Sequence, residues 1–225
     1  MIRKRNLILY QWIGTIFPVM MHVLIGYLFG ALPIADRVSR RRGVDIFNSG
    51  TRMAGAANVR KSVGHYTAGI VLLGDMAKGV MAIVSARIVG IENGWLVLVG
   101  LAAILGHWNS VFSGFRGGDG LATLGGIYVG LFPIPGIVAG IVASIVALGA
   151  QRASYTSLLS IVFGYITLMI FYWIYDLNGI HLIGCGVLSV LVLLHAVNSN
   201  LRRRKYQSLT NIQDSVITTD QAKPN

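Results

Sequence analysis

Long apolar blocks, separated by short polar segments, run along almost the whole chain. Each block is close to the ~20 residues that a helix needs to cross the hydrocarbon core of a bilayer. Because a backbone in lipid must satisfy its own hydrogen bonds, the blocks are predicted to be helices. The candidate spans are residues 7–34, 66–91, 94–113, 118–132, 134–150, 155–175 and 179–199. The pattern therefore predicts an all-α, polytopic membrane protein with about seven transmembrane helices.

The composition agrees with this membrane fold. Of the 225 residues, 54% are hydrophobic and only 12% are charged, whereas a soluble domain carries about 25% charged residues. The pattern shows no internal repeat and no second domain, so residues 1–205 are expected to form a single transmembrane domain. Residues 206–225 are polar and without periodicity, and we expect them to form a disordered tail.

Positive charge is concentrated in two segments. The net charge is +11, with seven arginine and lysine residues between residues 35 and 64 and four more at residues 202–205. By the positive-inside rule both segments should face the cytoplasm, with the N-terminus on the other side, although the basic residues at positions 3–5 oppose this orientation. The charge favours anionic lipid or an anionic substrate as partner. Nucleic acid is not expected, because most of the chain would lie in lipid.

The first polar cluster is the loop formed by residues 45–61. Its glycines and alanines leave backbone N–H groups accessible to a ligand, and Gly-rich loops bind phosphate in this way. Thr51 and Asn58 add neutral donors, while Arg52 and Arg60 add positive charge. The alternative is a flexible basic loop in contact with lipid headgroups.

The second cluster is a pair of opposite charges inside a predicted span. Asp75 and Lys78 are three residues apart and therefore lie on one face of a helix. Ionisable groups are rare and costly inside a membrane. The two residues therefore either serve the function or neutralise each other as a structural pair.

The third cluster joins a helix end to a glycine-rich turn within residues 106–123. His107 is a candidate base, a phosphate donor or a satisfied buried polar group. Asp119 lies in the middle of the turn, where its carboxylate would repel a bound phosphate. Two unit charges ~4 Å apart interact by about 4 kcal/mol at an effective dielectric of about 20. The glycines that could form an anion-binding turn are Gly117, Gly118 and Gly120.

A last polar pair, His195 and Asn198, lies at the end of the final predicted span with the same spacing of three residues. Without further information, ordinary interfacial residues would look the same. The five histidines are scattered, and the sequence has no HExxH or CxxC spacing, so no metal site is predicted.

Taken in order, the four clusters resemble the motifs of the bacterial acyl-phosphate:glycerol-3-phosphate acyltransferase family, the PlsY type. The resemblance covers residues 24–200, nearly the whole chain. The matching residues are Gly30 to Pro33, Asp45, Ile46, Gly50, Gly55, Ala56, Asn58, Val59, Asp75, Lys78, Gly79, Gly106, His107, Val111, Phe112, Phe115, Gly117, Gly118, Gly120, Ala122, Thr123, His195 and Asn198.

Several motif positions differ from the family pattern. Phe47 stands where the family has the arginine of D-I-R, and Arg52 is a candidate to restore that charge. Asp119 stands where the family has the lysine of G-G-K-G. We expect either that Asp119 turns away and pairs with a cation such as Arg116 or Arg52, or that the turn no longer holds phosphate. The other replacements include Thr51, Met53, Ala57 and Ser110.

The resemblance implies a seven-helix enzyme of the bacterial inner (plasma) membrane with its active site facing the cytoplasm. It implies transfer of an acyl chain from acyl phosphate to the 1-hydroxyl of glycerol 3-phosphate, giving lysophosphatidic acid in phospholipid synthesis. Acyl phosphate is already an activated mixed anhydride, so neither a cofactor nor a covalent nucleophile is expected. The protein must hold two phosphates, align the hydroxyl and stabilise the oxyanion.

The resemblance also implies roles for the polar residues. The expected catalytic residues are His195, Asn198 and His107, and the base is one of the histidines or the substrate's own phosphate. The expected phosphate-binding residues are Thr51, Asn58, Arg60, Lys78, Gly117, Gly118 and Gly120. The expected supporting residues are Asp45, Asp75, Arg52 and Arg116. Two alternatives stay open: a divergent member with lost or altered activity, and a non-enzymatic membrane protein that binds anionic lipid.

Overall fold

The computed structural model describes residues 2–149 and 156–221, and the regular structure in these residues is helical. The main helices are α1 (Ile2–Ala31), α4 (His65–Ile88), α5 (Gly94–Trp108), α6 (Leu121–Leu131), α7 (Pro133–Gly149), α8 (Thr156–Tyr175) and α9 (Gly179–Gln221). The short elements are α2 (Ile34–Arg40), α3 (Ala56–Ser62) and the 3-10 turn η1 (Val111–Ser113).

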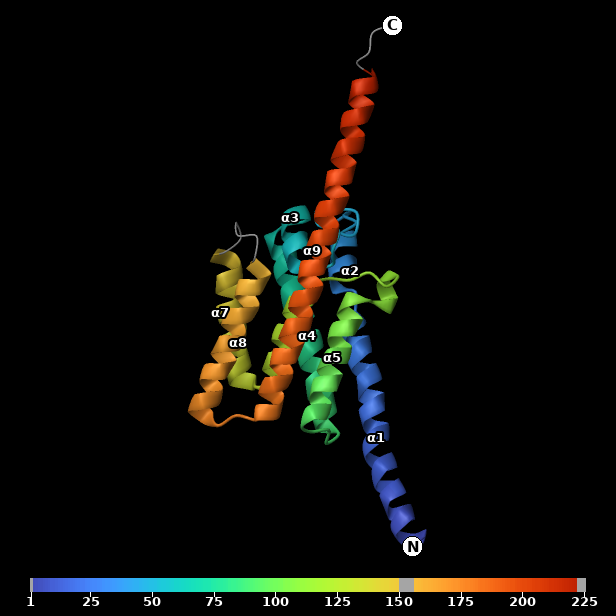
Figure 1. Ribbon diagram of the computed structural model, residues 1–225, viewed down its shortest axis with the longest axis vertical. Helices are drawn as coiled ribbons and strands as arrows, with labels where there is room; N and C mark the ends of the chain where they lie inside the picture. Colours follow the sequence, from blue (N-terminus) through green and yellow to red (C-terminus); the bar gives the residue numbers. More distant parts are fainter. Residues whose placement is uncertain (1, 150–155, 222–225) are drawn as a thin grey trace.

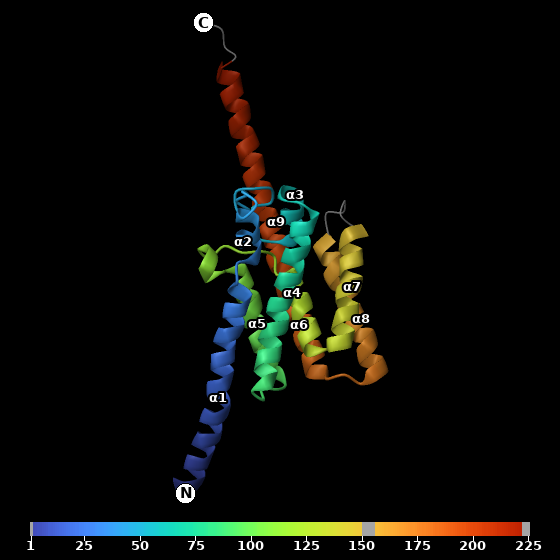
Figure 2. The same cartoon turned by 180° about the vertical axis from the view of Figure 1, so that it is seen from behind.

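The main helices form a bundle and run in alternating directions, as both views show (Figure 1, Figure 2). The two chain ends lie at opposite ends of the molecule, with the start of α1 at the bottom and the end of α9 at the top of Figure 1. The short helices α2 and α3 and the connection from α5 to α6 lie on the side toward which α9 projects. We call this side the polar end of the bundle, because it carries the first and third polar clusters.

Proline and glycine set the helix boundaries next to the polar end. Helix α1 ends two residues before Pro33, because proline disfavours helical backbone in the residue before it and has no N–H to donate. Gly64, with φ +136°, separates α3 from α4, and Gly120, with φ +88°, precedes α6. Glycine adopts these backbone angles without the steric penalty of other residues.

Within the described residues, five helices are long and apolar enough to cross a membrane. Helices α6 and α7 are apolar but shorter. With 11 residues, α6 is about 17 Å long, well below the ~30 Å of a hydrocarbon core. The expected span over residues 118–132 is therefore wrong in extent, because the chain stays non-helical as far as Gly120. The all-α membrane fold is confirmed, and the count of seven spans stays a prediction.

Helix α9 continues beyond the bundle to Gln221 (Figure 1). Its 43 residues correspond to about 65 Å. The expectation of a disordered tail over residues 206–225 stays a prediction, and residues 222–225 lie outside the described residues. Extending an existing helix needs no new nucleus, so a polar segment can continue a helix that is anchored elsewhere. The expectation of a single domain over residues 1–205 stays a prediction.

Small residues let the main helices approach one another closely. A side chain at Gly30 of α1 would overlap the Ala103 carbonyl of α5, and one at Gly106 of α5 would overlap the Tyr27 carbonyl of α1. Gly126 of α6 meets the backbone of α4 in the same way. Close backbone approach at small residues is a usual source of helix association in membranes. These contacts fix the positions of α4, α5 and α6, which carry most of the polar clusters.

Apolar side chains fill the centre of the bundle and also cover its outer surface. The central core includes Ile83, Val99 and Leu188, which are at most 1% exposed. On the outside, Leu73 is 68% exposed and Trp173 is 80% exposed. A surface of this kind is suited to contact with lipid rather than water.

Candidate active site

A small apolar core anchors the first polar loop at the polar end. Ile46 and Phe47 of the loop pack with Ala35 of α2, Val59 of α3 and Val71 of α4, and all five are at most 5% exposed. Because the contacts come from several elements, the loop between α2 and α3 is held in a defined conformation.

Asn58 of α3 organises this loop from within. Its side chain is 2% exposed, and its Nδ2 donates to the carbonyls of Ile46, Ser49 and Met53 at 3.0–3.2 Å. Its Oδ1 accepts the N–H of Thr51 at 2.9 Å. The amide therefore shapes the loop from inside, and the expectation that Asn58 contacts phosphate stays a prediction.

Asp45 and Gly50 shape the same loop. Oδ1 of Asp45 accepts the N–H of Phe47 at 3.0 Å, and Oδ2 accepts Nδ2 of Asn48 at 2.8 Å, which forms an Asx turn. Gly50 has φ +56°, and a side chain there would overlap Oδ1 of Asn58. Asp45 therefore acts on the loop conformation, and Gly50 is required by both the backbone angle and the space.

Asp75 and Lys78 of α4 form a buried ion pair with 2.7 Å between Oδ1 and Nζ, and both side chains are 3% exposed. His107 of α5 places its Nδ1 3.8 Å from the same carboxylate oxygen. Among the described residues, this Nδ1 has no hydrogen-bond partner. The structure thus brings a carboxylate, an ammonium and an imidazole together at one buried point between α4 and α5.

The glycine-rich turn packs directly against His107. A side chain at Gly117 would overlap the His107 carbonyl, and one at Gly118 would meet Nε2 of His107 and the Ala54 carbonyl. The N–H of Gly118 donates to the His107 carbonyl at 3.3 Å, and the N–H of Ala54 donates to the Gly117 carbonyl at 3.0 Å. The turn therefore joins the first loop to the Asp75–Lys78–His107 cluster.

His195 of α9 reaches this turn through Trp108. The two rings are stacked with centroids 4.2 Å apart and planes within 7°. Nε1 of Trp108 donates to the Asp119 carbonyl at 3.0 Å. His195 is half-buried, whereas Asn198, one turn further along α9, is exposed. The structure therefore brings His195 to the turn and leaves Asn198 at the surface of the helix.

The other expected binding residues belong to the first loop itself. Thr51 is half-buried and donates its N–H to Asn58. Arg52 is exposed with φ +57°, and Arg60 is half-buried on α3. Their place at the polar end adds positive potential beside the cluster.

Arg116 is held against the first loop by an aromatic ring. Its Cζ lies 4.4 Å from the centroid of Phe47. The guanidinium that was a candidate partner for Asp119 therefore lies on Phe47, at the position where the family motif has arginine. Asp119 itself is half-buried. The two expectations for Asp119, that it pairs with a cation or that the turn no longer holds phosphate, both stay predictions.

A narrow cavity connects these groups. Asp75, Lys78, His107 and Arg116 line it together with Gly117. Its volume is about 10 Å³, room for roughly one water molecule, so a phosphate requires movement of the surrounding loops. The described residues contain no group of three or more His, Cys, Asp or Glu side chains that could hold a metal ion.

Sequence reasoning gave no site role to three residues of this region. Trp108 carries the stack with His195, and an aromatic residue in an apolar helix gives no signal of such a role. The buried Ser110 hydroxyl donates to the Ala31 carbonyl and ties the turn to α1. The Thr123 hydroxyl, in the first turn of α6, is buried without a hydrogen-bond partner in the described part of the chain. Both are polar residues in apolar surroundings, which is the signal that could have found them.

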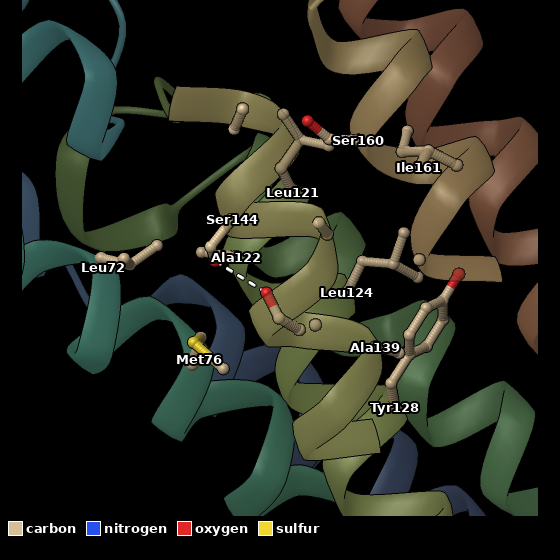
Figure 3. A pocket seen from close by; sticks show the side chains of 15 residues that line it. Leu72, Met76, Leu121, Ala122, Leu124, Tyr128, Ala139, Ser144, Ser160 and Ile161 are labelled. Carbon is tan, nitrogen blue, oxygen red and sulfur yellow. Dashed lines mark hydrogen bonds between the residues drawn. The ribbon is translucent and has the colours of Figure 1, made fainter. Parts of the chain in front are cut away.

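A second, apolar cavity of about 140 Å³ lies between α4, α6, α7 and α8 (Figure 3). Met76 of α4, Leu124 and Tyr128 of α6 and Ile161 of α8 point into it. The Ser144 hydroxyl in its wall donates to the carbonyl of Gly140 on the same helix at 2.7 Å. The lining is therefore suited to a hydrocarbon group. The cavity begins at Leu121 and Ala122, directly after the glycine-rich turn.

The sequence and structure resemble known proteins. A family model described as glycerol-3-phosphate acyltransferase matches residues 20–205. The glycerol-3-phosphate acyltransferase of Roseiflexus sp. (strain RS-1) is 40% identical over 132 residues, which are 59% of this chain and 64% of that protein. Glycerol-3-phosphate acyltransferase 1 of Deinococcus radiodurans is 41% identical over 121 residues, which are 54% of this chain and 61% of that protein. These matches span less than two thirds of the relatives' own length.

A solved structure matches over more of the chain. The crystal structure of PlsY (YgiH), an integral membrane glycerol 3-phosphate acyltransferase, in its glycerol 3-phosphate form is 27% identical with a TM-score of 0.67. The match covers 84% of this chain and 92% of that chain. The family model covers all four polar clusters, from the first loop to His195 and Asn198. The chain is a membrane protein that belongs to the glycerol-3-phosphate acyltransferase family.

Proposed function

We propose that the protein transfers an acyl chain from acyl phosphate to the 1-hydroxyl of glycerol 3-phosphate, giving lysophosphatidic acid and inorganic phosphate. The observation that carries the proposal is the contact of the glycine-rich turn with the buried Asp75–Lys78–His107 cluster. Family membership and the likeness to a glycerol 3-phosphate form support the same substrate.

Phosphate binding is assigned to Lys78, the backbone of Gly117 to Gly120 and the first N–H groups of α6. The N-terminal N–H groups of a helix have no partner inside the helix and attract anions. Arg52, Arg60 and Thr51 lie at the rim of this region. Asp75 holds Lys78 in place rather than touching the anionic substrate, because two negative charges repel.

The transfer is a direct substitution at the acyl carbon. The 1-hydroxyl oxygen forms the new ester bond, the bond from the acyl carbon to the phosphate oxygen breaks, and phosphate leaves with the electron pair. The hydroxyl proton goes to His195, to His107 or to a substrate phosphate. Trp108 fixes the ring of His195, which is the kind of preorganisation that a base requires.

The apolar cavity is the proposed place of the acyl chain. Its first lining residues, Leu121 and Ala122, follow the turn directly, so a phosphate at the turn places its chain along α6. The cavity walls from α4, α7 and α8 are apolar and match a hydrocarbon chain. In the proposed reaction, acyl phosphate brings the chain and lysophosphatidic acid carries it away into the membrane.

We further propose that the protein lies in the bacterial inner membrane with its polar end facing the cytoplasm. The support is the excess of lysine and arginine at this end, between residues 35 and 64. Glu92 and Asp176 lie in the loops at the opposite end, where acidic residues are compatible with the rule. Glycerol 3-phosphate is then bound from the cytoplasmic side.

Assay of the purified protein tests the proposal. With palmitoyl phosphate and glycerol 3-phosphate, we expect lysophosphatidic acid acylated at the 1-hydroxyl, identified by mass spectrometry. Removal of a general base should reduce the rate by about 100-fold or more, so His195→Ala and His107→Ala are measured in parallel. A folded wild-type protein that binds glycerol 3-phosphate but forms no product supports lost or altered activity instead. Binding of anionic vesicles without affinity for glycerol 3-phosphate supports the lipid-binding alternative.

A further inference from the structure

We propose that Phe47 is a positioning residue that holds the Arg116 guanidinium at the mouth of the narrow cavity, where Arg116 binds a substrate phosphate. The proposal rests on the proposed function for its substrate. Its structural basis is the stack of the two side chains, with Cζ of Arg116 4.4 Å from the Phe47 centroid. Arg116 also lines the cavity that contains Lys78 and His107.

The ring of Phe47 is a rigid support. It is 5% exposed and packs in the small apolar core with Ala35 and Val59. Its backbone N–H is fixed by Oδ1 of Asp45 at 3.0 Å. An aromatic ring held in this way keeps its face toward Arg116, whereas a free arginine side chain would sample many rotamers.

The backbone next to Arg116 is fixed as well. The carbonyl of Gly117 accepts the N–H of Ala54 at 3.0 Å, and the N–H of Gly118 donates to the His107 carbonyl at 3.3 Å. The Arg116–Phe47 contact and the Ala54–Gly117 hydrogen bond both join the first loop to the glycine-rich turn, and the Gly118–His107 hydrogen bond joins that turn to α5. Arg116 is therefore held at both its backbone and its guanidinium.

The cation–π contact with Phe47 leaves N–H donors of the Arg116 guanidinium for an oxyanion. This matters because Asp75 lies 2.7 Å from Lys78 and offsets its charge. Arg116 supplies positive charge that the ion pair does not. A phosphate monoester at the cavity mouth is the ligand that this combination fits.

Position 47 is also one of the places where this chain differs from the family motif. The motif that the first loop resembles carries an arginine where this chain has Phe47. The guanidinium of Arg116, from the segment between α5 and α6, lies over the Phe47 ring instead. Arg116 therefore places a positive charge at this position.

Steady-state kinetics with each substrate varied in turn tests the proposal. We expect Arg116→Gln to raise the KM for one phosphate substrate by about tenfold or more, with a smaller change in kcat, since charge-assisted hydrogen bonds are lost. Phe47→Leu should raise the same KM by about five- to thirtyfold, and Phe47→Tyr should restore most of the affinity. The substrate whose KM changes identifies which phosphate, that of glycerol 3-phosphate or of acyl phosphate, Arg116 binds.

The combined variant separates positioning from a general structural effect. If Phe47 acts through Arg116, adding Phe47→Leu to Arg116→Gln raises the KM no further. Equal effects of Phe47→Leu in both backgrounds would overturn the proposal. Arg42→Gln removes another exposed charge at the polar end and should change the KM by less than about twofold, as a screened surface charge.

A binding measurement keeps the test independent of turnover. Glycerol 3-phosphate or inorganic phosphate should raise the Tm of the wild-type protein, and Arg116→Gln and Phe47→Leu should reduce that shift. Arg116→Lys keeps the charge but loses the fork of N–H donors and the contact geometry with Phe47, so we expect it to reduce the Tm shift as Arg116→Gln does. This variant takes the place of Phe47→Leu in the test if Phe47→Leu does not fold. Full phosphate protection of both arginine variants would contradict the proposal, even in a protein without acyl transfer.

Discussion

At the scale of single residues, the buried pair of Asp75 and Lys78 is the strongest electrostatic feature of the polar end. Both side chains are 3% exposed, and His107 lies 3.8 Å from the same carboxylate oxygen. Removing one partner leaves an uncompensated buried charge, which costs about 3–5 kcal/mol. Asp75→Asn and Lys78→Met alone should therefore lower the free energy of unfolding by this amount.

The double variant Asp75→Asn/Lys78→Met decides whether the pair is functional. We expect it to regain much of the stability, because no buried charge remains, but to have lost acyl transfer. Thermal unfolding and initial rates measure the two properties. The exposed Asp36–Arg40 pair of α2, also 2.7 Å apart, is a matched control whose removal should change stability by less than about 1 kcal/mol. Full activity of the double variant would make the pair purely structural.

Asn58 and Arg116 show which features of single residues the sequence does not predict. The sequence identifies Asn58 as a polar residue of a phosphate-binding type of loop, but its amide turns inward to Ile46, Ser49 and Met53. The direction of a side chain depends on the folded loop, which residue spacing does not specify. The stack of Arg116 on Phe47 has the same origin, because the two residues are far apart in sequence and meet only in the folded protein.

At the scale of elements, α6 forms one wall of the apolar cavity. Gly125 lines the apolar cavity, and a Cβ there meets nothing within 4 Å. Gly125→Leu should therefore fill the cavity without disturbing the helix contacts. We expect transfer of long acyl chains to fall by about tenfold relative to short chains, as when a hydrophobic pocket loses room for part of its substrate. Rates with acyl phosphates of 8 and 16 carbons measure the ratio.

Gly69→Leu on α4 is the matched control for this change. Its Cβ also meets nothing within 4 Å, and Gly69 does not line the cavity among the described residues. Both substitutions add the same apolar side chain to a helix. If Gly125→Leu and Gly69→Leu give the same chain-length profile, the acyl chain lies elsewhere.

The apolar pattern predicts most of the helices because each long block needs to be buried in lipid or in the bundle. It fails at α6, where helix begins only at Leu121 after the glycine-rich turn. At the end of α9, a polar segment continues the helix to Gln221. Composition identifies what a segment can bury, but helix length also depends on what precedes the segment and on the helix that it extends.

At the scale of the whole molecule, the candidate chemistry gathers at one end of the bundle. The first loop, the glycine-rich turn and the Trp108–His195 stack lie there, although they come from widely separated parts of the chain. The order of the motifs predicts which residues belong to the site. Their convergence follows from the alternating directions of the helices, which place alternate connections at the same end.

We propose that acyl transfer takes place at the polar end, from the cytoplasmic side. Sealed membrane vesicles test it directly, because charged glycerol 3-phosphate does not cross a bilayer unaided. Vesicle orientation is determined with Lys61→Cys, an exposed position at the polar end, in a background with Cys185→Ala. With acyl phosphate in the membrane and glycerol 3-phosphate outside, we predict lysophosphatidic acid from inverted vesicles and none from right-side-out vesicles. Product from sealed right-side-out vesicles, or none from either orientation, would contradict this account.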